Sequence, residues 1–191
     1  KVDLARASEL NKKSVKPLML LSAILIKQKN YDDALNTLSK ADKIDRDNPL
    51  ILFQIGSIYY KKDDGKYLGY FDRLFDLVRN DTSDEAASYR KAFGILLREH
   101  YRRGNYSRSI QIIDAMPDRE TNFDLRITKA RSLYYTGDFQ GAADIFERLS
   151  LEDEDKFLLC RCLASTGRSE KARSILEKLV SQAKYKQNAR D

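Results

Sequence analysis

The sequence is poor in the residues from which catalytic centres are built. It contains one His, His100, which lies within residues 98–102 with no Ser or Cys motif around it. A nucleophilic triad needs a His beside an activated Ser or Cys, so triad chemistry has no support here. The eight glycines are dispersed, and they form no glycine-rich phosphate loop. We therefore predict a protein that is not an enzyme and that uses no cofactor.

The two cysteines cannot readily supply a disulfide or a metal site. Cys160 and Cys162 are two residues apart on an expected helix, and residues at that spacing point to different faces. A Cys-x-Cys metal site would need further ligands, and His100 is distant in the sequence. We expect reduced, buried thiols, which leave both a cytoplasmic and a periplasmic location open. The acidic run at 152–155 precedes an expected helix, whose N-terminal dipole accounts for the carboxylates without a metal ion.

Long apolar runs and blocks of one charge are also missing. The longest apolar run covers residues 17–26, which is about half of what a membrane-spanning helix needs. The net charge is +6 at pH 7, and acidic residues are interspersed among the basic ones. Without a basic block, RNA binding is a weaker alternative. With 3 Pro, 8 Gly and 34% charged residues, the composition is typical of a helical protein with solvated faces, and no strand pattern competes.

A turn pattern recurs along the whole chain. An aromatic residue, replaced by Ser in the last copy, follows an Asn or Gly turn at intervals of 36, 39, 33 and 30 residues, and that period indicates a helical solenoid. The five turns are Asn30-Tyr31, Gly65-Lys66-Tyr67, Gly104-Asn105-Tyr106, Gly137-Asp138-Phe139 and Gly167-Arg168-Ser169. Before the second turn, Leu52, Ile55 and Tyr59 share one helical face, and after the fourth turn Ala142 and Phe146 share another. Each copy is therefore expected to be a helix–turn–helix hairpin.

The two halves of this pattern resemble the tetratricopeptide repeat family. Leu52-x2-Ile55-Gly56-x2-Tyr59 is similar to the family's first helix, and Ala142-x3-Phe146 is similar to its second helix. The second-helix pattern recurs as Ala34-x3-Leu38 with Ala41, and as Ala172-x3-Leu176. The resemblance implies an all-α fold, an α-solenoid of antiparallel helix hairpins wound into a right-handed superhelix. It also implies that the small residues Gly56 and Ala142 lie at close helix–helix contacts.

We expect one solenoid over residues 1–191. Its five repeats would cover about 15–48, 49–83, 84–120, 121–152 and 153–185, with the end of a truncated repeat at 1–14 and a polar tail at 186–191. The copies depart from the family pattern in places, because none has the family's Trp and the second has extra residues around Asp63. Pro117 predicts a short second helix in the third repeat. Thr82 and Glu85 have the spacing of a capping box, which would open a long helix there.

An Arg recurs six residues before the last three turn glycines, as Arg98, Arg131 and Arg161. In solenoids of the family that the chain resembles, the first helices line the concave surface, so these side chains would project together into one groove. Their guanidinium groups suit carboxylates. The other residues predicted to bind a partner in this groove are Tyr60, Tyr101, Tyr134, Lys61 and Arg102. An alternative also stays open, in which each Arg pairs with an acidic side chain of its own or a neighbouring hairpin.

The resulting functional prediction is an interaction scaffold. Its concave groove would bind an extended acidic peptide or a partner subunit, and no membrane span is expected. Binding of a chaperone tail is disfavoured, because the members that clamp a terminal carboxylate use Lys and Asn where this chain has Met19 and Ala23. The alternative is an assembly segment of a longer chain, for example in a bacterial secretion or polysaccharide-export complex.

Overall fold

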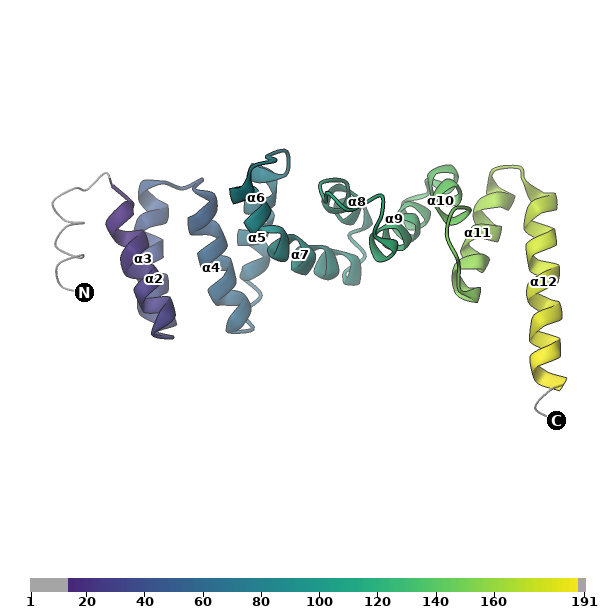
Figure 1. Cartoon of the computed structure of the whole chain (residues 1–191), viewed down its shortest axis with the longest axis horizontal. Helices are drawn as coiled ribbons and strands as arrows, with labels where there is room; N and C mark the ends of the chain where they lie inside the picture. Colours follow the sequence, from purple (N-terminus) through teal and green to yellow (C-terminus); the bar gives the residue numbers. More distant parts are fainter. Residues whose placement is uncertain (1–13, 189–191) are drawn as a thin grey trace. The chain divides into compact units, whose positions relative to one another are not determined.

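The part of the chain that the structure describes is entirely helical. The computed structural model describes residues 14–188, with side chains through Gln182, and this range holds eleven α-helices and no strand (Figure 1). The helices are α2 (Lys16–Lys27), α3 (Tyr31–Ile44), α4 (Pro49–Lys61), α5 (Tyr67–Val78), α6 (Asp84–Ser88), α7 (Arg90–Arg102), α8 (Tyr106–Asp114), α9 (Phe123–Thr136), α10 (Phe139–Phe146), α11 (Asp153–Ser165) and α12 (Ser169–Asn188). The expected all-α class is confirmed. The truncated repeat at 1–14 lies almost wholly outside the described residues, and the repeat boundaries and the superhelix stay predictions.

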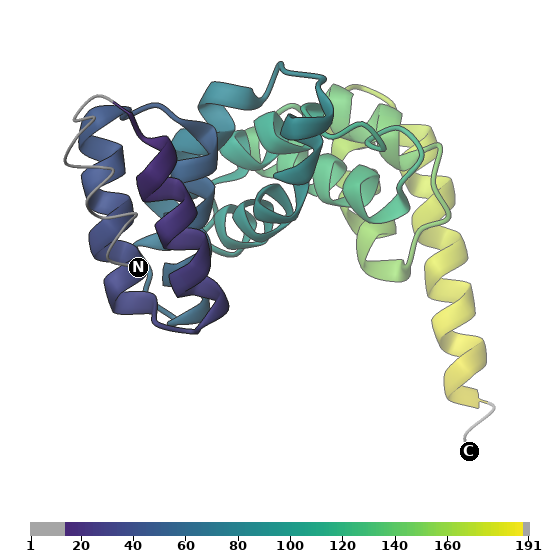
Figure 2. The same cartoon turned by 60° about the vertical axis from the view of Figure 1, so that its left-hand side comes forward.

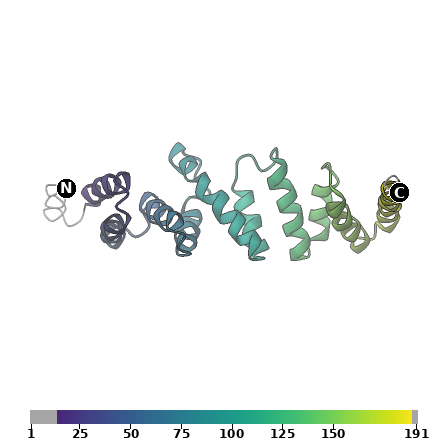
Figure 3. The same cartoon turned by 90° about the horizontal axis from the view of Figure 1, so that it is seen from below.

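The chain divides into two compact units, Lys1–Leu96 and Leu97–Asp191. In unit 1, α2 packs on α3, α3 on α4, and α4 on α5, and Figures 1 and 2 show α2 and α3 side by side as an antiparallel pair. In unit 2, α9 packs on α8 and α10, and α11 packs on α10 and α12 (Figure 3). The expected helix hairpins are therefore present in both units.

The same backbone turn closes all five hairpins. In each turn, one residue has a positive φ, and the next residue donates the hydrogen bond that closes the turn. The residues with a positive φ are Lys29 (59°), Asp63 (54°), Gly104 (76°), Gly137 (89°) and Gly167 (78°). The N–H of the next residue then donates to a carbonyl five residues earlier, at 2.8–2.9 Å. These donors are Asn30, Asp64, Asn105, Asp138 and Arg168. This is the Schellman arrangement, which satisfies carbonyls at a helix end. In the second turn the left-handed residue is Asp63, and the Gly65 that marked the turn in the sequence follows it.

Small residues let the two helices of a hairpin approach closely. A Cβ built on Gly56 of α4 would lie 2.5 Å from Cε1 of Phe71 on α5, too close for any side chain. Ala142 of α10 is fully buried in the core of unit 2, together with Phe146 and Leu163. The expected close contact at Gly56 is confirmed, and Ala142 is buried in the core.

The entry to the third hairpin differs from the sequence expectation. Ser83, and not Thr82, caps the helix there, because its Oγ accepts the Ala86 N–H at 3.2 Å. The expected long helix is also divided into α6 and α7. Tyr89 lies at this break, where it is 2% exposed and packs on the Phe53 ring at a centroid distance of 5.2 Å. The short second helix is confirmed, since α8 ends at Asp114, before Pro117.

Candidate functional site

A hollow of unit 1 lies mainly on its first helices. It has a volume of about 580 Å³ and is lined by α2, α4, α7 and one residue of α5. The apolar lining residues are Ala23, Ile26, Phe53, Ile58, Phe71, Ala92 and Ile95, and the polar ones are Gln54, Ser57, Tyr60, Lys61 and Lys91. The Ser22 hydroxyl of α2 lies 3.0 Å from Oε1 of Gln54, a lining residue on α4, and this contact joins the two helices. We call this hollow the unit 1 groove.

Two of the residues predicted to bind a partner lie at the rim of the unit 1 groove. Tyr60 is 41% exposed, and its ring packs edge-on against Tyr67 at a centroid distance of 5.2 Å. The Lys61 ammonium lies 5.7 Å from the centre of the Tyr31 ring. Sequence reasoning missed Lys91, the second cation of the groove. Its position seven residues before Arg98 was a usable signal, since that spacing places two residues on one helical face.

Arg131 of unit 2 is engaged by a buried carboxylate. Its Nε and one terminal nitrogen donate to the two oxygens of Asp155 at 2.7 and 2.8 Å, joining α9 to α11. The Asp155 side chain is 4% exposed, and that of Arg131 is 35% exposed. The hydrogen bonds to Asp155 raise the pKa of Arg131 above its usual value. At Arg131, the structure therefore contains the ion pair that the sequence left open as an alternative.

In unit 2, the recurring Arg of one first helix contacts a Tyr of the first helix before it. The Arg161 guanidinium lies 5.3 Å from the centre of the Tyr134 ring, which is 8% exposed. One repeat earlier, Arg131 interacts with Tyr101, and burial raises the pKa of the Tyr101 hydroxyl while Arg131 opposes that rise. In both cases the Tyr of one first helix lies against the Arg of the next. The spacing of these two residue types thus has a packing explanation within unit 2.

The remaining predicted residues of unit 2 lie at the end of α7. Arg98 is exposed. Arg102 donates to Glu99 at 2.7 Å, and Arg103 donates to the same carboxylate at 2.6 Å. These two hydrogen bonds lower the pKa of Glu99 to about 2. The structure therefore brings Arg131 to Tyr101 and Arg161 to Tyr134, whereas Arg102 is turned toward its own helix.

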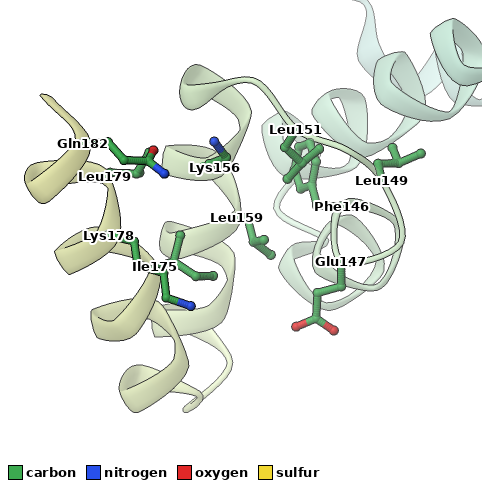
Figure 4. A pocket seen from close by; sticks show the side chains of 10 residues that line it. All are labelled: Phe146, Glu147, Leu149, Leu151, Lys156, Leu159, Ile175, Lys178, Leu179 and Gln182. Carbon is green, nitrogen blue, oxygen red and sulfur yellow. The ribbon is translucent and has the colours of Figure 1, made fainter. Parts of the chain in front are cut away.

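A smaller apolar hollow of unit 2 lies between the last three helices. It measures about 280 Å³, and Figure 4 shows Leu159 of α11 between Phe146 of α10 and Ile175 of α12. Lys156 and Lys178 are the basic residues of its lining. Six of its ten lining residues are apolar, and the polar ones are Glu147, Lys156, Lys178 and Gln182.

Neither the cysteines nor the histidine forms a reactive site in the described residues. Cys160 and Cys162 are free and buried, as expected, and burial raises the pKa of the Cys162 thiol to about 11. His100 is buried, with its Nδ1 3.2 Å from Nδ2 of Asn105 in the turn that follows. Over residues 14–182, no cluster of His, Cys, Asp and Glu could hold a metal ion. No helix in the same part of the chain is both long enough and apolar enough to cross a membrane.

Comparisons with known proteins agree with this architecture. A family model described as a TPR repeat, the tetratricopeptide repeat, matches residues 23–63, which include α3 and α4. The structure of YrrB, described as "a TPR protein with an unusual peptide-binding site", is similar with a TM-score of 0.54 and 17% identity, over 93% of this chain and 91% of that one. The structure of a mutant form of MamA has a TM-score of 0.54 and 17% identity, over 89% of this chain and 92% of that one.

A larger complex contains a similar segment. A chain of the structure of Naa15/Naa10 bound to HypK-THB has a TM-score of 0.63 and 16% identity over 91% of this chain. The similar region is 27% of that chain, so this protein spans about a quarter of its length. No curated protein sequence matches the chain.

Proposed function

Because residues 23–63 match a tetratricopeptide repeat and the chain has the fold of such proteins, we propose that it is a non-catalytic scaffold for a protein partner. The partner would present an extended acidic segment to the unit 1 groove. The observation that carries this proposal is the composition of that groove, an apolar floor with a Lys at two points of its lining.

The groove suits a peptide that alternates apolar and acidic residues. Phe53, Ile58 and Ile95 offer an apolar surface that a Leu or Phe side chain of the partner can cover. Lys61 and Lys91 can each donate to a carboxylate, and a hydrogen bond to a charged group contributes about 1.5–3 kcal/mol. Gln54 and Ser57 provide polar groups that can bond to a peptide backbone. The peptide-binding site named for the similar YrrB protein supports the same reading.

The arginines of unit 2 differ from one another in how well they can bind an acidic partner. Arg98 and Arg161 are exposed and can reach an acidic partner with their guanidinium groups. Arg131 already donates two hydrogen bonds to Asp155, so it has fewer N–H groups to offer. We therefore assign the anion contacts of the unit 1 groove to Lys61 and Lys91, with Tyr60 as an aromatic contact, and Arg98 and Arg161 are separate candidate anion contacts of unit 2.

The test uses synthetic peptides of one length and a series of compositions. Acidic peptides with a central Leu or Phe are compared by fluorescence anisotropy with neutral and basic peptides of the same apolar content. We expect the intact chain to prefer the acidic series, and the double variant Lys61→Glu with Lys91→Glu to bind it more weakly by about tenfold or more. The matched control is Lys40→Glu with Lys43→Glu on α3, where both side chains are exposed away from the groove lining. Equal losses in both variants would contradict the proposal.

A further inference from the structure

A continuous chain of aromatic rings contributes to the lining of the unit 1 groove. Five rings are in contact one after another: Tyr60 with Tyr67 at 5.2 Å between centroids, Tyr67 with Phe71 at 5.9 Å, Phe71 with Phe53 at 6.5 Å, and Phe53 with Tyr89 at 5.2 Å. Three of these rings, those of Tyr60, Phe53 and Phe71, line the groove. The apolar part of the groove is therefore partly aromatic, and its rings are held in place by further rings.

Two of the three lining rings have surface that a partner can reach. Phe71 is 1% exposed, and Tyr89, on the other side of Phe53, is 2% exposed. Phe53 itself is half-buried, so its two neighbours fix its ring while part of it remains open to the groove. Tyr60 is 41% exposed. Phe53 thus offers a fixed ring within the groove, and Tyr60 offers a second one at the rim.

Small side chains on three helices leave room for a further ring in the groove. Ala23 of α2, Ser57 of α4 and Ala92 of α7 line the groove together with Phe53. Ser57 lies four residues after Phe53, on the same face of α4. An apolar cavity of about 150 Å³ is large enough to hold a benzene molecule, and the groove has a volume of about 580 Å³. A whole aromatic side chain of a partner therefore fits beside Phe53.

We propose that the partner segment is anchored in the unit 1 groove by an aromatic side chain, a Phe or a Tyr, whose ring packs on Phe53 and extends the chain of rings. The anchor is flanked by the acidic residues that Lys61 and Lys91 bind. This inference rests on the proposed function, because it specifies the apolar anchor of the same peptide. It adds that the groove selects an aromatic anchor over an aliphatic one.

Contact between rings, rather than apolar area, is the reason for this selection. A pair of aromatic rings in a tilted, edge-on or offset arrangement raises an affinity by about two- to tenfold beyond the effect of the area that it buries. The rings of the chain already adopt such arrangements, with interplanar angles of 52° for Phe53 and Tyr89 and 82° for Tyr60 and Tyr67. An aliphatic anchor gains only from burial, because it has no ring quadrupole.

The test compares three synthetic peptides that differ in one central residue. All have one length and the same acidic residues, and the central residue is Phe, cyclohexylalanine or Leu. Cyclohexylalanine has nearly the shape of Phe but no π electrons, so the hydrophobic effect alone would not make it the weaker ligand. In fluorescence anisotropy, we expect the intact chain to bind the Phe peptide about two- to tenfold more tightly than the cyclohexylalanine peptide.

Two pairs of variants locate the anchor. In Phe53→Leu, we expect the Phe and cyclohexylalanine peptides to bind equally, whereas the control Phe123→Leu, at a 47% exposed ring of unit 2, should keep the preference. Ala23→Phe places a ring of the chain itself in the groove and should weaken the Phe peptide by about tenfold or more. Its control is Leu20→Phe, one turn earlier on α2, where the side chain is 54% exposed and outside the groove lining. Circular dichroism should show intact helices in all four variants.

The outcomes separate this inference from the proposed function. If the acidic peptides bind but the cyclohexylalanine or Leu peptide binds as tightly as the Phe peptide, the aromatic anchor is wrong and the proposed function stands. If none of the three peptides binds, both are contradicted. An unchanged preference in Phe53→Leu would contradict the assigned ring. Sedimentation velocity over a concentration series tests the other occupant, since a dimer that Ala23→Phe dissociates would assign the groove to a second copy and overturn the assignment to a partner.

Discussion

At the scale of single residues, Gly56 lies where the packing of α4 on α5 leaves no room for a side chain, and this can be tested directly. Its Cα approaches the Phe71 ring so closely that a built Cβ lies 2.5 Å from Cε1, and Phe71 is 1% exposed. We expect Gly56→Leu to cost about 1–3 kcal/mol of stability through overpacking, with a similar cost for Ala142→Leu. Urea denaturation measures both. The control is Gly94→Ala, because a Cβ at Gly94 meets nothing within 4 Å and should gain about 0.5–1 kcal/mol of helix propensity.

Variants of Arg131 and Asp155 test whether one of the recurring Arg residues stabilises the fold. Removing the guanidinium in Arg131→Ala leaves the buried Asp155 carboxylate without its partner, which we expect to cost about 1–3 kcal/mol because the Arg131 side chain is 35% exposed to solvent. The double variant Arg131→Leu with Asp155→Leu should recover most of that loss, because two apolar side chains need no charge compensation. Arg98→Ala should change stability by less than about 0.5 kcal/mol, as expected for an exposed side chain. A stable Arg131→Ala protein would argue against a structural pair.

Glu99 gives a pH-dependent prediction. The Arg102 and Arg103 hydrogen bonds hold its pKa at about 2, below the usual value of 4.5. A carboxyl with a lowered pKa stabilises the folded chain above pH 4.5, and this contribution is lost as the pH falls toward 2. NMR titration of the Glu99 carboxyl carbon should give the low value in the intact chain. In the variant Arg102→Ala with Arg103→Ala, the pKa should return toward 4.5, and an unchanged value would contradict the assigned cause.

At the scale of elements, the turns differ in how well their residues suit them. The left-handed position is Gly137 in the fourth hairpin and Lys29 in the first. A side chain in this region costs about 1–2 kcal/mol, so Gly137→Ala should destabilise the chain and Lys29→Gly should stabilise it. Gly65→Ala is the control, since Gly65 has neither a positive φ nor a close neighbour. Thermal melting measures the order of the three melting temperatures. The reverse order would contradict the positive φ at Gly137 and Lys29.

The helices could be predicted from the sequence more securely than their ends. Periodic apolar residues and the recurring turns were sufficient to predict the hairpins, because both signals are local. The break between α6 and α7 was not predictable, since it depends on Tyr89 packing against Phe53 of another helix. The choice of Ser83 as the cap was equally open, because Thr82 and Ser83 are adjacent and both can accept a backbone N–H. The left-handed backbone conformation of Lys29 and Asp63 could not be predicted either, because neither residue is a Gly.

At the scale of the whole molecule, residue type alone could not determine the candidate site. Tyr60 and Lys61 were predicted from the sequence to bind a partner, and in the structure they line the unit 1 groove with Lys91. The engagement of Arg131 by Asp155 depends on two residues 24 positions apart on different helices, and no periodicity identifies that pair.

The charge of the whole molecule gives the last prediction, which separates a peptide scaffold from an RNA-binding protein. The net charge of +6 is spread over the sequence, and the proposed peptide site uses few cations. Binding of single-stranded RNA weakens with salt with a logarithmic slope of about −0.7 for each phosphate contact, and most of its affinity is electrostatic. Binding of an apolar and acidic peptide also depends on buried area, which salt does not screen.

We therefore expect the acidic peptide to lose about tenfold or less in affinity between low and physiological salt, and a single-stranded RNA of similar length to lose much more. Fluorescence anisotropy over a salt series measures both ligands with the same protein. The variant Lys61→Glu with Lys91→Glu should weaken the peptide at every salt concentration, because it removes the cations of the groove. An RNA that binds more tightly than the peptide at physiological salt would reverse the assignment, since the spread of basic residues would then act as one binding surface.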